Sequence, residues 1–167
     1  MTITPIPAEA WALDAGAAPV ELAAAWTDGA AADVPIGTAW DVVRISRRLG
    51  YAALARIRCA DAPIGPVLET PWREAVEVVV PRGTAAVWPA IPGTRPVARG
   101  TLRCPPPRIT VASGLTSTGG RRWIVPPGHA AAVTDADTLC EEAAAALLHR
   151  ISVGLRIDGR RPVVARP

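Results

Sequence analysis

The chain has 167 residues, 50% of them hydrophobic and 20% charged, with a formal net charge of +3 at pH 7. This length is typical of one domain with a single core, and the composition excludes an intrinsically disordered chain. No uncharged stretch approaches the roughly 18 apolar residues that a membrane-spanning helix needs. The N-terminus also lacks the basic and apolar regions of a secretory signal. We therefore expect a cytoplasmic protein without a membrane partner.

The cysteines and the basic residues limit the chemistry further. Cys59, Cys104 and Cys140 are widely spaced and form no cluster with histidine, so we expect reduced thiols and no zinc site. All 18 basic residues are arginines, a bias that GC-rich coding alone would produce. Residues 1–43 contain six acids and no arginine, whereas residues 78–134 contain seven arginines and no acid. This asymmetry has two explanations. The basic half provides a surface that binds phosphates or an acidic partner, or the two halves lie against each other and their charges cancel.

Helices are expected first along the chain. Pro7 suits the start of a short helix over residues 8–15, and Pro19 suits the start of a second one. The second helix is expected to end at the turn signal Asp28-Gly29.

The centre of the chain predicts one strand, then a helix, and then two further strands. The β-branched residues of TAWDVVRI predict a strand over 38–45. Ser46 can cap a helix over 47–58, whose apolar residues recur every four positions. Further strands are predicted over 64–69 and 74–81, and the apolar run of the latter suits the centre of a sheet.

Proline and glycine divide the next part of the chain. Three prolines predict an irregular connection over 89–98. Strands are predicted over 100–104 and 108–114, on either side of a Pro-Pro-Pro stop. A loop is expected over 113–120, followed by a strand over 121–125.

The element with the clearest sequence pattern is a helix over 135–152. Thr134 and Asp137 resemble a capping box at its start. With helices first, strands grouped in the middle and this helix near the end, the chain predicts an α+β fold with a mostly antiparallel or mixed central sheet. Residues 1–157 are expected to form one domain. Residues 158–167 are expected to be a basic tail or the last strand of a hairpin.

Three segments, in this order, resemble the N-terminal domain of bifunctional DNA primase/polymerases. More closely, they are similar to the short actinobacterial proteins that share that domain. The segments are PIGTAWDVVRISRRLGYAALARI (35–57), GPVLETPWREAVEVVVPRGTAAVWP (65–89) and RITVASGLTSTGGRRWIVPPG (108–128). The resemblance implies metal-dependent nucleotidyl transfer, in which carboxylates on adjacent strands hold two divalent cations. It also implies a histidine that contacts the incoming triphosphate.

The sequence departs from that catalytic pattern. Asp41 is the only acid on the first strand, and Val43 stands where a second acid would be. The later strand offers Glu74 and Glu77 but no histidine, and a third carboxylate has no candidate. We therefore predict no primase or polymerase activity, no catalytic residue, no cofactor and no bound metal. Asp41 is at most the remnant of a metal site, and we expect it to cap a strand edge or to neutralise nearby arginines.

Other chemical candidates are weak. His129 follows a Pro-Pro-Gly turn, and His149 lies near the end of the last helix, so both are expected to be structural or solvent-facing. The loop SGLTSTGG lacks the lysine of a phosphate-binding loop, and hairpin geometry explains its glycines.

The stretch TGGRRWIV is the strongest candidate for a contact with nucleic acid. Arg121 and Arg122 precede Trp123, and arginines can contact phosphates while an aromatic ring stacks on a base. The alternative is that Trp123 lies in the core and one arginine points outward, as strand alternation would give. The other candidate nucleic-acid-binding residues are Arg44, Arg47, Arg48, Arg103 and Arg108.

Two interpretations follow. The first is a catalytically inactive primase/polymerase-like domain that binds DNA, RNA or a protein partner through an arginine-bearing sheet. The alternative is a structural or protein-interaction domain with no nucleic-acid role. The family resemblance requires residues 40–45 and 74–80 to be neighbouring strands of one sheet.

Overall fold

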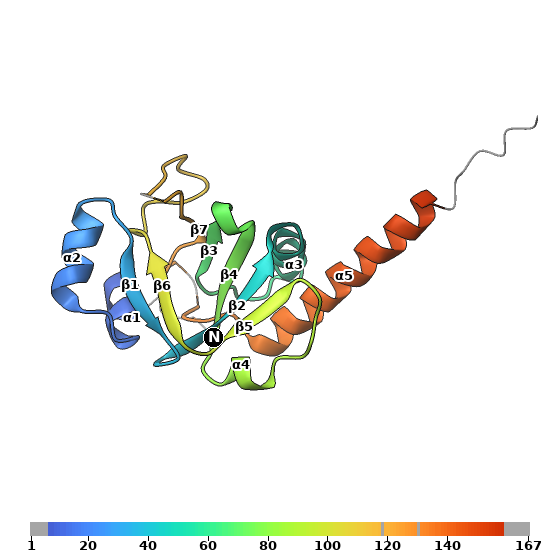
Figure 1. Ribbon diagram of the computed structural model, residues 1–167, viewed down its shortest axis with the longest axis horizontal. Helices are drawn as coiled ribbons and strands as arrows, with labels where there is room; N and C mark the ends of the chain where they lie inside the picture. The colour runs from blue at the N-terminus through green and yellow to red at the C-terminus, as the bar shows by residue number, and fades with distance from the viewer. Residues whose placement is uncertain (1–6, 118, 130, 159–167) are drawn as a thin grey trace, which may run out of the picture.

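The computed structural model describes residues 7–117, 119–129 and 131–158 and has the predicted α+β class (Figure 1). In chain order its elements are α1 (Ala8–Asp14), α2 (Pro19–Thr27), β1 (Ala32–Ile36), β2 (Trp40–Ser46), α3 (Arg47–Cys59), β3 (Val67–Thr70), the 3-10 turn η1 (Pro71–Arg73), β4 (Ala75–Pro81), α4 (Thr84–Val87), β5 (Thr94–Val97), β6 (Gly100–Cys104), β7 (Arg122–Val125) and α5 (Ala136–Asp158).

Five strands form the central sheet in the order β5-β2-β4-β3-β7, and every neighbouring pair is antiparallel. Strands β2 and β4 lie side by side, with Val42 opposite Val79. A separate antiparallel ribbon consists of β1 and β6. The expected antiparallel sheet is therefore present, and so is the adjacency of residues 40–45 and 74–80.

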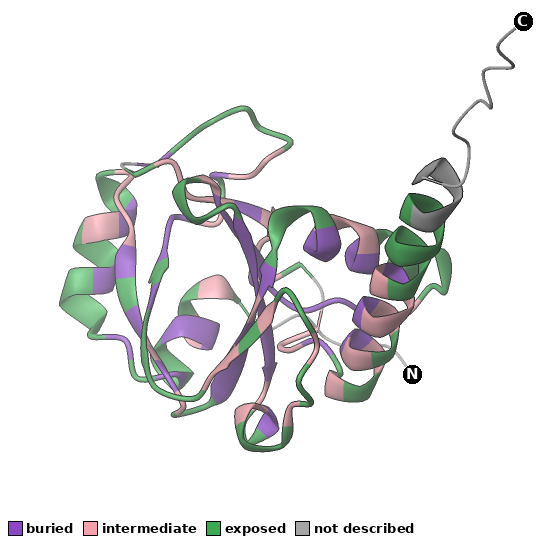
Figure 2. Ribbon diagram, turned by 45° about the vertical axis from the view of Figure 1, so that its right-hand side comes forward, coloured by how far each residue is buried: buried purple, intermediate pink, exposed green. Residues whose placement is uncertain are grey.

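The central sheet buries a different core on each face (Figure 2). Strand alternation places Trp40 and Val42 on one face and Val43 and Ile45 on the other. We call the first the tryptophan face, because it packs against α1, α2 and the β1–β6 ribbon through Trp11, which stacks on Trp40 with 5.0 Å between ring centroids. The second is the helix face, and α3 and α5 cover it (Figure 1).

The periodicity of the sequence explains the elements that were predicted. Helix α3 turns Leu49, Ala53 and Ile57 toward the sheet, because residues spaced four apart share one side of a helix. Strand β4 is buried along its whole length except for its last residue, as its continuous apolar run indicates.

Two predictions for the proline-rich parts of the chain are wrong. Residues 94–97 form β5 despite Pro96, because β5 is an edge strand, where a missing backbone N–H is tolerated. Residues 108–114 do not form a strand, and only Thr110 makes an isolated bridge, to Trp123. Their backbone turns instead, with the N–H of Ile109 donating to the carbonyl of Pro106 at 2.9 Å.

Helix α5 begins with a cap other than the predicted one. The Asp135 carboxylate accepts the backbone N–H and the hydroxyl of Thr138, each at 2.8 Å, so the expected capping box of Thr134 and Asp137 is wrong. Thr134 is buried, and its hydroxyl accepts the N–H of Gly65 at 3.0 Å.

The first half of α5 packs on α3 and the sheet, whereas its second half projects away from the body of the domain (Figure 1). The helix runs to residue 158, and residues 159–167 lie outside the described part, where the predicted tail or hairpin falls. Within the described residues, no helix has the length and apolar character needed to cross a membrane.

The chain passes between the ribbon and the central sheet three times, and the first two passages meet. The first passage is the turn between β1 and β2, where the N–H of Gly37 donates to the carbonyl of Trp40 at 2.7 Å. The second is the link between β5 and β6. A Cβ atom at residue 37 would lie 2.1 Å from the carbonyl oxygen of Ala98 in that link, and the φ of Gly37 is +93°. Only glycine fits this crossing.

Candidate nucleic-acid interface

The tryptophan face of the sheet is apolar at one end and polar at the other. Following Trp40 and Val42 along β2, strand alternation brings Arg44 to the same face. Arg44 donates through Nε (2.9 Å) and Nη2 (2.6 Å) to Oε1 of Glu77 on the neighbouring β4. The other carboxylate oxygen, Oε2, accepts the hydroxyl of Thr70 on β3 at 2.8 Å. Three adjacent strands thus share one polar group around Glu77, which is 2% exposed.

A second arginine lies opposite the first. In the register of β2 and β5, Arg95 faces Arg44, and Arg95 is exposed. Like charges directly opposite each other in an antiparallel pair are unfavourable. Glu77 pairs with Arg44, and the structure shows no ion pair of Arg95 with a described acidic residue. This part of the face therefore has more positive than negative charge.

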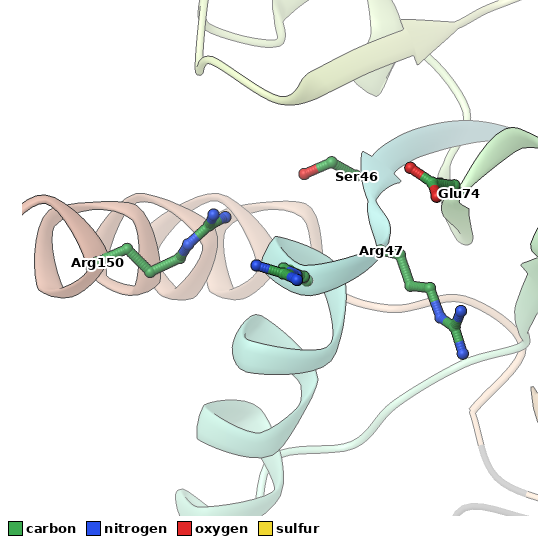
Figure 3. Close-up of a pocket in the computed structure, with 5 residues that line it drawn as sticks. Ser46, Arg47, Glu74 and Arg150 are labelled. Atoms are coloured by element: carbon green, nitrogen blue, oxygen red, sulfur yellow. The ribbon is translucent and has the colours of Figure 1, made fainter. Parts of the chain in front are cut away.

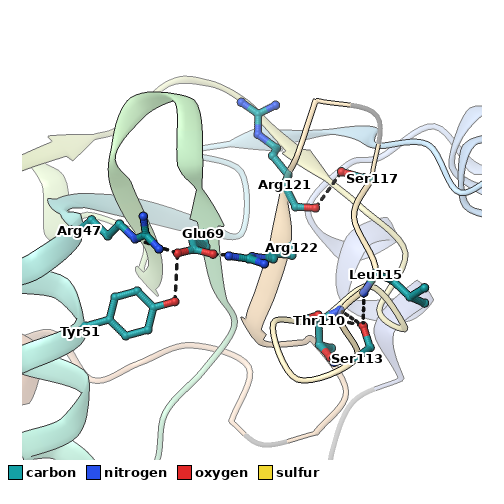
Figure 4. Close-up of polar contacts among 9 residues, drawn as sticks. All are labelled: Arg47, Tyr51, Glu69, Thr110, Ser113, Leu115, Ser117, Arg121 and Arg122. Atoms are coloured by element: carbon teal, nitrogen blue, oxygen red, sulfur yellow. Dashed lines mark hydrogen bonds and ion pairs between the residues drawn. The ribbon is translucent and has the colours of Figure 1, made fainter.

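Arg121 lies two residues before Trp123 and so reaches the same face. The preceding loop holds its backbone, because the Ser117 hydroxyl donates to the carbonyl of Arg121 at 2.8 Å (Figure 4). Its Nε atom is buried and has no hydrogen-bond partner among the described residues. Burial lowers the pKa of Arg121, and repulsion from Arg73 and Arg103 lowers it further, against the attraction of Glu77.

Trp72 is at the tip of the hairpin between β3 and β4 and is 60% exposed. The guanidinium carbon of Arg73 lies 4.4 Å from the centre of its ring, and that of Arg121 lies 5.4 Å from it. Both distances are typical of cation–π contacts. We use the name arginine cluster for Arg44, Arg73, Arg95 and Arg121.

The sequence prediction did not include Trp72, Arg73 or Arg95. A Pro-Trp-Arg turn between two strands is a signal for an aromatic residue at a hairpin tip. The chain has six tryptophans and no phenylalanine, so a tryptophan in the sequence does not by itself distinguish an interface from the core.

Arg122 and Arg47 were predicted to contact nucleic acid, but both pair with Glu69 on the helix face (Figure 4). Glu69 is fully buried, and its carboxylate accepts Arg122 Nε at 2.6 Å and the Tyr51 hydroxyl at 3.1 Å, with Arg47 Nε at 3.1 Å. Burial raises the pKa of Tyr51, and the charge of Glu69 raises it further. These two arginines neutralise an internal charge, and their contact with nucleic acid stays a prediction.

The predicted stacking role of Trp123 is wrong. Its side chain is 0% exposed, and its indole N–H donates to the carbonyl of Pro105 at 2.8 Å. Its ring meets that of Trp11 edge to face, with 6.1 Å between centroids. The alternative prediction, in which Trp123 lies in the core, is confirmed.

The remaining predicted arginines do not form one patch. Arg103 lies on the ribbon, where its Nε is 3.2 Å from a carboxylate oxygen of Asp33. Arg108 lies beside the C-terminal end of α2 and lines a cavity there with Trp26. Arg48 lines a different cavity, between α3 and α5. Of the eight predicted contact residues, only Arg44 and Arg121 belong to the arginine cluster.

Asp41 caps a turn, as predicted, but it does not neutralise an arginine. Its Oδ2 atom accepts the N–H groups of Gly83 and Ala85, each at 2.9 Å. Asp41 alternates with Val43 and so lies toward the helix face, away from Arg44. The expected interaction with the following arginines is therefore wrong.

The carboxylates do not fit the two-cation site that the family resemblance implies. Asp41 binds backbone N–H groups, Glu69 binds two arginines and a tyrosine, and Glu77 binds Arg44 and a threonine. Each of the three is thus committed to protein donors. Among the described residues, no three or more His, Cys, Asp or Glu side chains gather in a way that could hold a metal ion.

Comparison with known proteins adds no family assignment. No family model matches the chain, and neither a curated protein nor a solved structure matches it. The resemblance to primase/polymerases remains a prediction from the three sequence segments.

Proposed function

We propose that this chain is a catalytically inactive primase/polymerase-like domain, cytoplasmic in location, that binds single-stranded nucleic acid through the arginine cluster. The observation that carries the proposal is Trp72, which is 60% exposed and lies within cation–π distance of the guanidinium groups of Arg73 and Arg121. Proteins that bind single strands without sequence preference combine an aromatic platform for bases with cations for the backbone phosphates.

The charge balance of the tryptophan face supports this proposal. Of the four arginines in the cluster, Arg44 alone pairs with a described carboxylate, that of the buried Glu77. Arg73, Arg95 and Arg121 have no ion pair with a described acid, and Arg73 and Arg95 are exposed. Phosphates would satisfy these guanidinium groups and release counterions from the nucleic acid.

The arrangement of the strands is consistent with the primase/polymerase part of the proposal. Strands β2 and β4 are neighbours, as the resemblance requires. The place between them on the tryptophan face holds an arginine–glutamate pair, Arg44 and Glu77, rather than a set of free carboxylates. In this neutral pair the carboxylate is already held by a guanidinium group, which supports binding without metal-dependent catalysis.

Fluorescence anisotropy of labelled single-stranded DNA, single-stranded RNA and duplex DNA, each at two salt concentrations with and without Mg²⁺, tests the proposal. We expect salt-sensitive and Mg²⁺-indifferent binding that is tightest for single strands. Replacing Arg73 and Arg121 together by alanine should remove about 1.4 from the magnitude of the log–log salt slope, because each phosphate contact on a single strand contributes about 0.7.

The variant Trp72→Ala separates the contribution of base stacking to affinity from that of the positive charges. Loss of one stacked base costs about 1–3 kcal/mol, so single-strand affinity should fall at least about fivefold while the salt slope stays unchanged. The matched control replaces Arg82 and Arg99, two exposed arginines away from the Trp72 hairpin, and should change affinity little. Absence of binding at low salt would refute the proposal and leave a structural or protein-interaction role as the better account.

A further inference from the structure

A cavity of about 410 Å³ lies where the start of α3 meets α5 and the corner between η1 and β4 (Figure 3). Its volume is in the range of small-molecule sites, about 300–1,000 Å³, but such sites usually have an apolar lining. This lining is polar and consists of Ser46, Arg47, Arg48, Glu74 and Arg150. A cavity with this lining suits a charged ligand.

Two of the three arginines in the lining are available to a ligand. Arg47 pairs with Glu69, and its guanidinium points away from Ser46 and Glu74 in Figure 3. Arg48 on α3 and Arg150 on α5 are exposed, and neither makes an ion pair with a described acidic residue. Two guanidinium groups on different helices thus share one cavity, and an anion between them would relieve their repulsion.

Ser46 adds a neutral donor at the same place. Its hydroxyl makes no capping hydrogen bond to α3 and remains free for a ligand. Gly93 lies beside Ser46, and a Cβ atom there would lie 3.1 Å from the Ser46 Oγ. The glycine therefore leaves space beside the hydroxyl.

Glu74 is the one carboxylate in the lining and is held in an uncommon backbone conformation. Its φ and ψ are 48° and 42°, in the left-handed region. Two hydrogen bonds fix it: its N–H donates to the carbonyl of Pro71 at 2.9 Å, and its carbonyl accepts the N–H of Arg47 at 2.7 Å. One carboxylate against the two guanidinium groups of Arg48 and Arg150, with Arg47 already paired to Glu69, leaves the lining positively charged.

We propose that this cavity binds a phosphoryl group. A guanidinium group can donate two parallel hydrogen bonds to phosphate oxygens, and the Ser46 hydroxyl can donate a third contact. The phosphoryl group can belong to a small phosphorylated molecule or to a nucleic-acid backbone. The inference goes beyond the function proposed above, because Arg48 and Arg150 do not belong to the arginine cluster.

Isothermal titration of the full chain with inorganic pyrophosphate, at constant ionic strength, tests the inference. We expect Arg48→Ala and Arg150→Ala each to weaken pyrophosphate binding about tenfold or more, since a hydrogen bond to a charged group contributes about 1.5–3 kcal/mol. Glu74→Gln should tighten binding, because it removes the opposing charge. Arg58→Ala is the matched control, since Arg58 is exposed on the same helix but does not line the cavity.

All of these side chains are exposed, so circular dichroism should show an unchanged fold in every variant. Undetectable pyrophosphate binding, or equal weakening by Arg58→Ala and Arg48→Ala, would overturn the inference.

The same variants, titrated with the labelled single strand, identify the source of the phosphoryl group. If Arg48→Ala and Arg150→Ala weaken pyrophosphate binding alone, the ligand is a small phosphorylated molecule. If they weaken both titrations, the cavity takes a backbone phosphate. Failure of the nucleic-acid proposal would appear separately, as indifference of single-strand binding to Arg73, Arg121 and Trp72.

Discussion

Two buried glutamates on adjacent strands have opposite surroundings. Glu69 on β3 faces the helices, and two arginines and a tyrosine surround its carboxylate. Glu77 on β4 faces the tryptophan side, and it pairs with only one of the four guanidinium groups of the arginine cluster. On the helix face the arginines complete an internal network, whereas on the tryptophan face positive charge exceeds negative charge.

This difference shows that the number of arginines in a segment does not by itself identify a nucleic-acid-binding surface. Arg121 and Arg122 are adjacent in sequence, yet strand alternation sends them to opposite faces. Arg122 compensates Glu69, while Arg121 lies over the ring of the exposed Trp72. The useful quantity is the local excess of guanidinium groups over carboxylates, which depends on the register of the strands.

The largest expected effect comes from a substitution that breaks the network around Glu69. Arg122→Ala should lower the free energy of unfolding by about 3 kcal/mol, because it leaves a buried carboxylate with one arginine instead of two. Urea denaturation followed by circular dichroism measures this loss. Arg121→Ala, at the adjacent position, is the matched control and should change stability by about 0.5 kcal/mol or less. Equal losses in the two variants would contradict the difference between the faces.

A smaller effect concerns the tyrosine of the same network. Tyr51→Phe should cost about 1 kcal/mol, the usual net value of one hydrogen bond. The folded protein raises the pKa of Tyr51 above its ordinary value of 10.0, so the folded state retains the phenolic proton more strongly than the unfolded state. Stability from this residue is therefore complete below pH 10.0 and is lost as the pH rises through the folded pKa.

Urea titrations across that alkaline range should show a steeper fall in stability for the natural chain than for Tyr51→Phe. Parallel curves would show that Tyr51 is not coupled to Glu69.

The smallest expected effect concerns Glu77 on the tryptophan face. Glu77→Gln removes the one buried negative charge within the arginine cluster, so affinity for single-stranded DNA should rise by about threefold, the order of a weak ion-pair interaction. Glu69→Gln, the matched change on the helix face, should not tighten binding. Anisotropy titrations compare the two variants directly, and an equal rise in both would locate the binding surface elsewhere.

The sequence predicted the elements whose side-chain periodicity is strong. Strand β2 alternates between two apolar faces, and α3 repeats apolar residues every four positions, so both were predicted within a few residues. Strand β5 was missed because Pro96 argues against a strand, and only its position at the sheet edge makes proline acceptable. That position is a property of the assembled sheet and is not visible locally.

The site was less accessible to prediction than the fold. Arg44 and Arg121 were named as candidates, but their grouping with Arg95 and Trp72 depends on the pairing of distant strands. Glu69 pairs with Arg47 and Arg122, two of the predicted contact residues. It stands at the end of a short apolar segment, and nothing in the sequence around it indicates that it is buried. Which acid pairs with which arginine depends on how distant strands and helices pack together. Residue type alone therefore could not predict these ion pairs.

The crossing at Gly37 also bears on how this chain can evolve. All 18 basic residues are arginines, a bias that GC-rich coding alone would produce at surface positions. Gly37 cannot drift in this way, because any side chain there would collide with the backbone of Ala98, and backbone has no alternative rotamer to adopt. A saturation library should tolerate most substitutions at exposed arginines and recover only glycine at residue 37. The two sheets can thus diverge in surface chemistry while the point that joins them stays fixed.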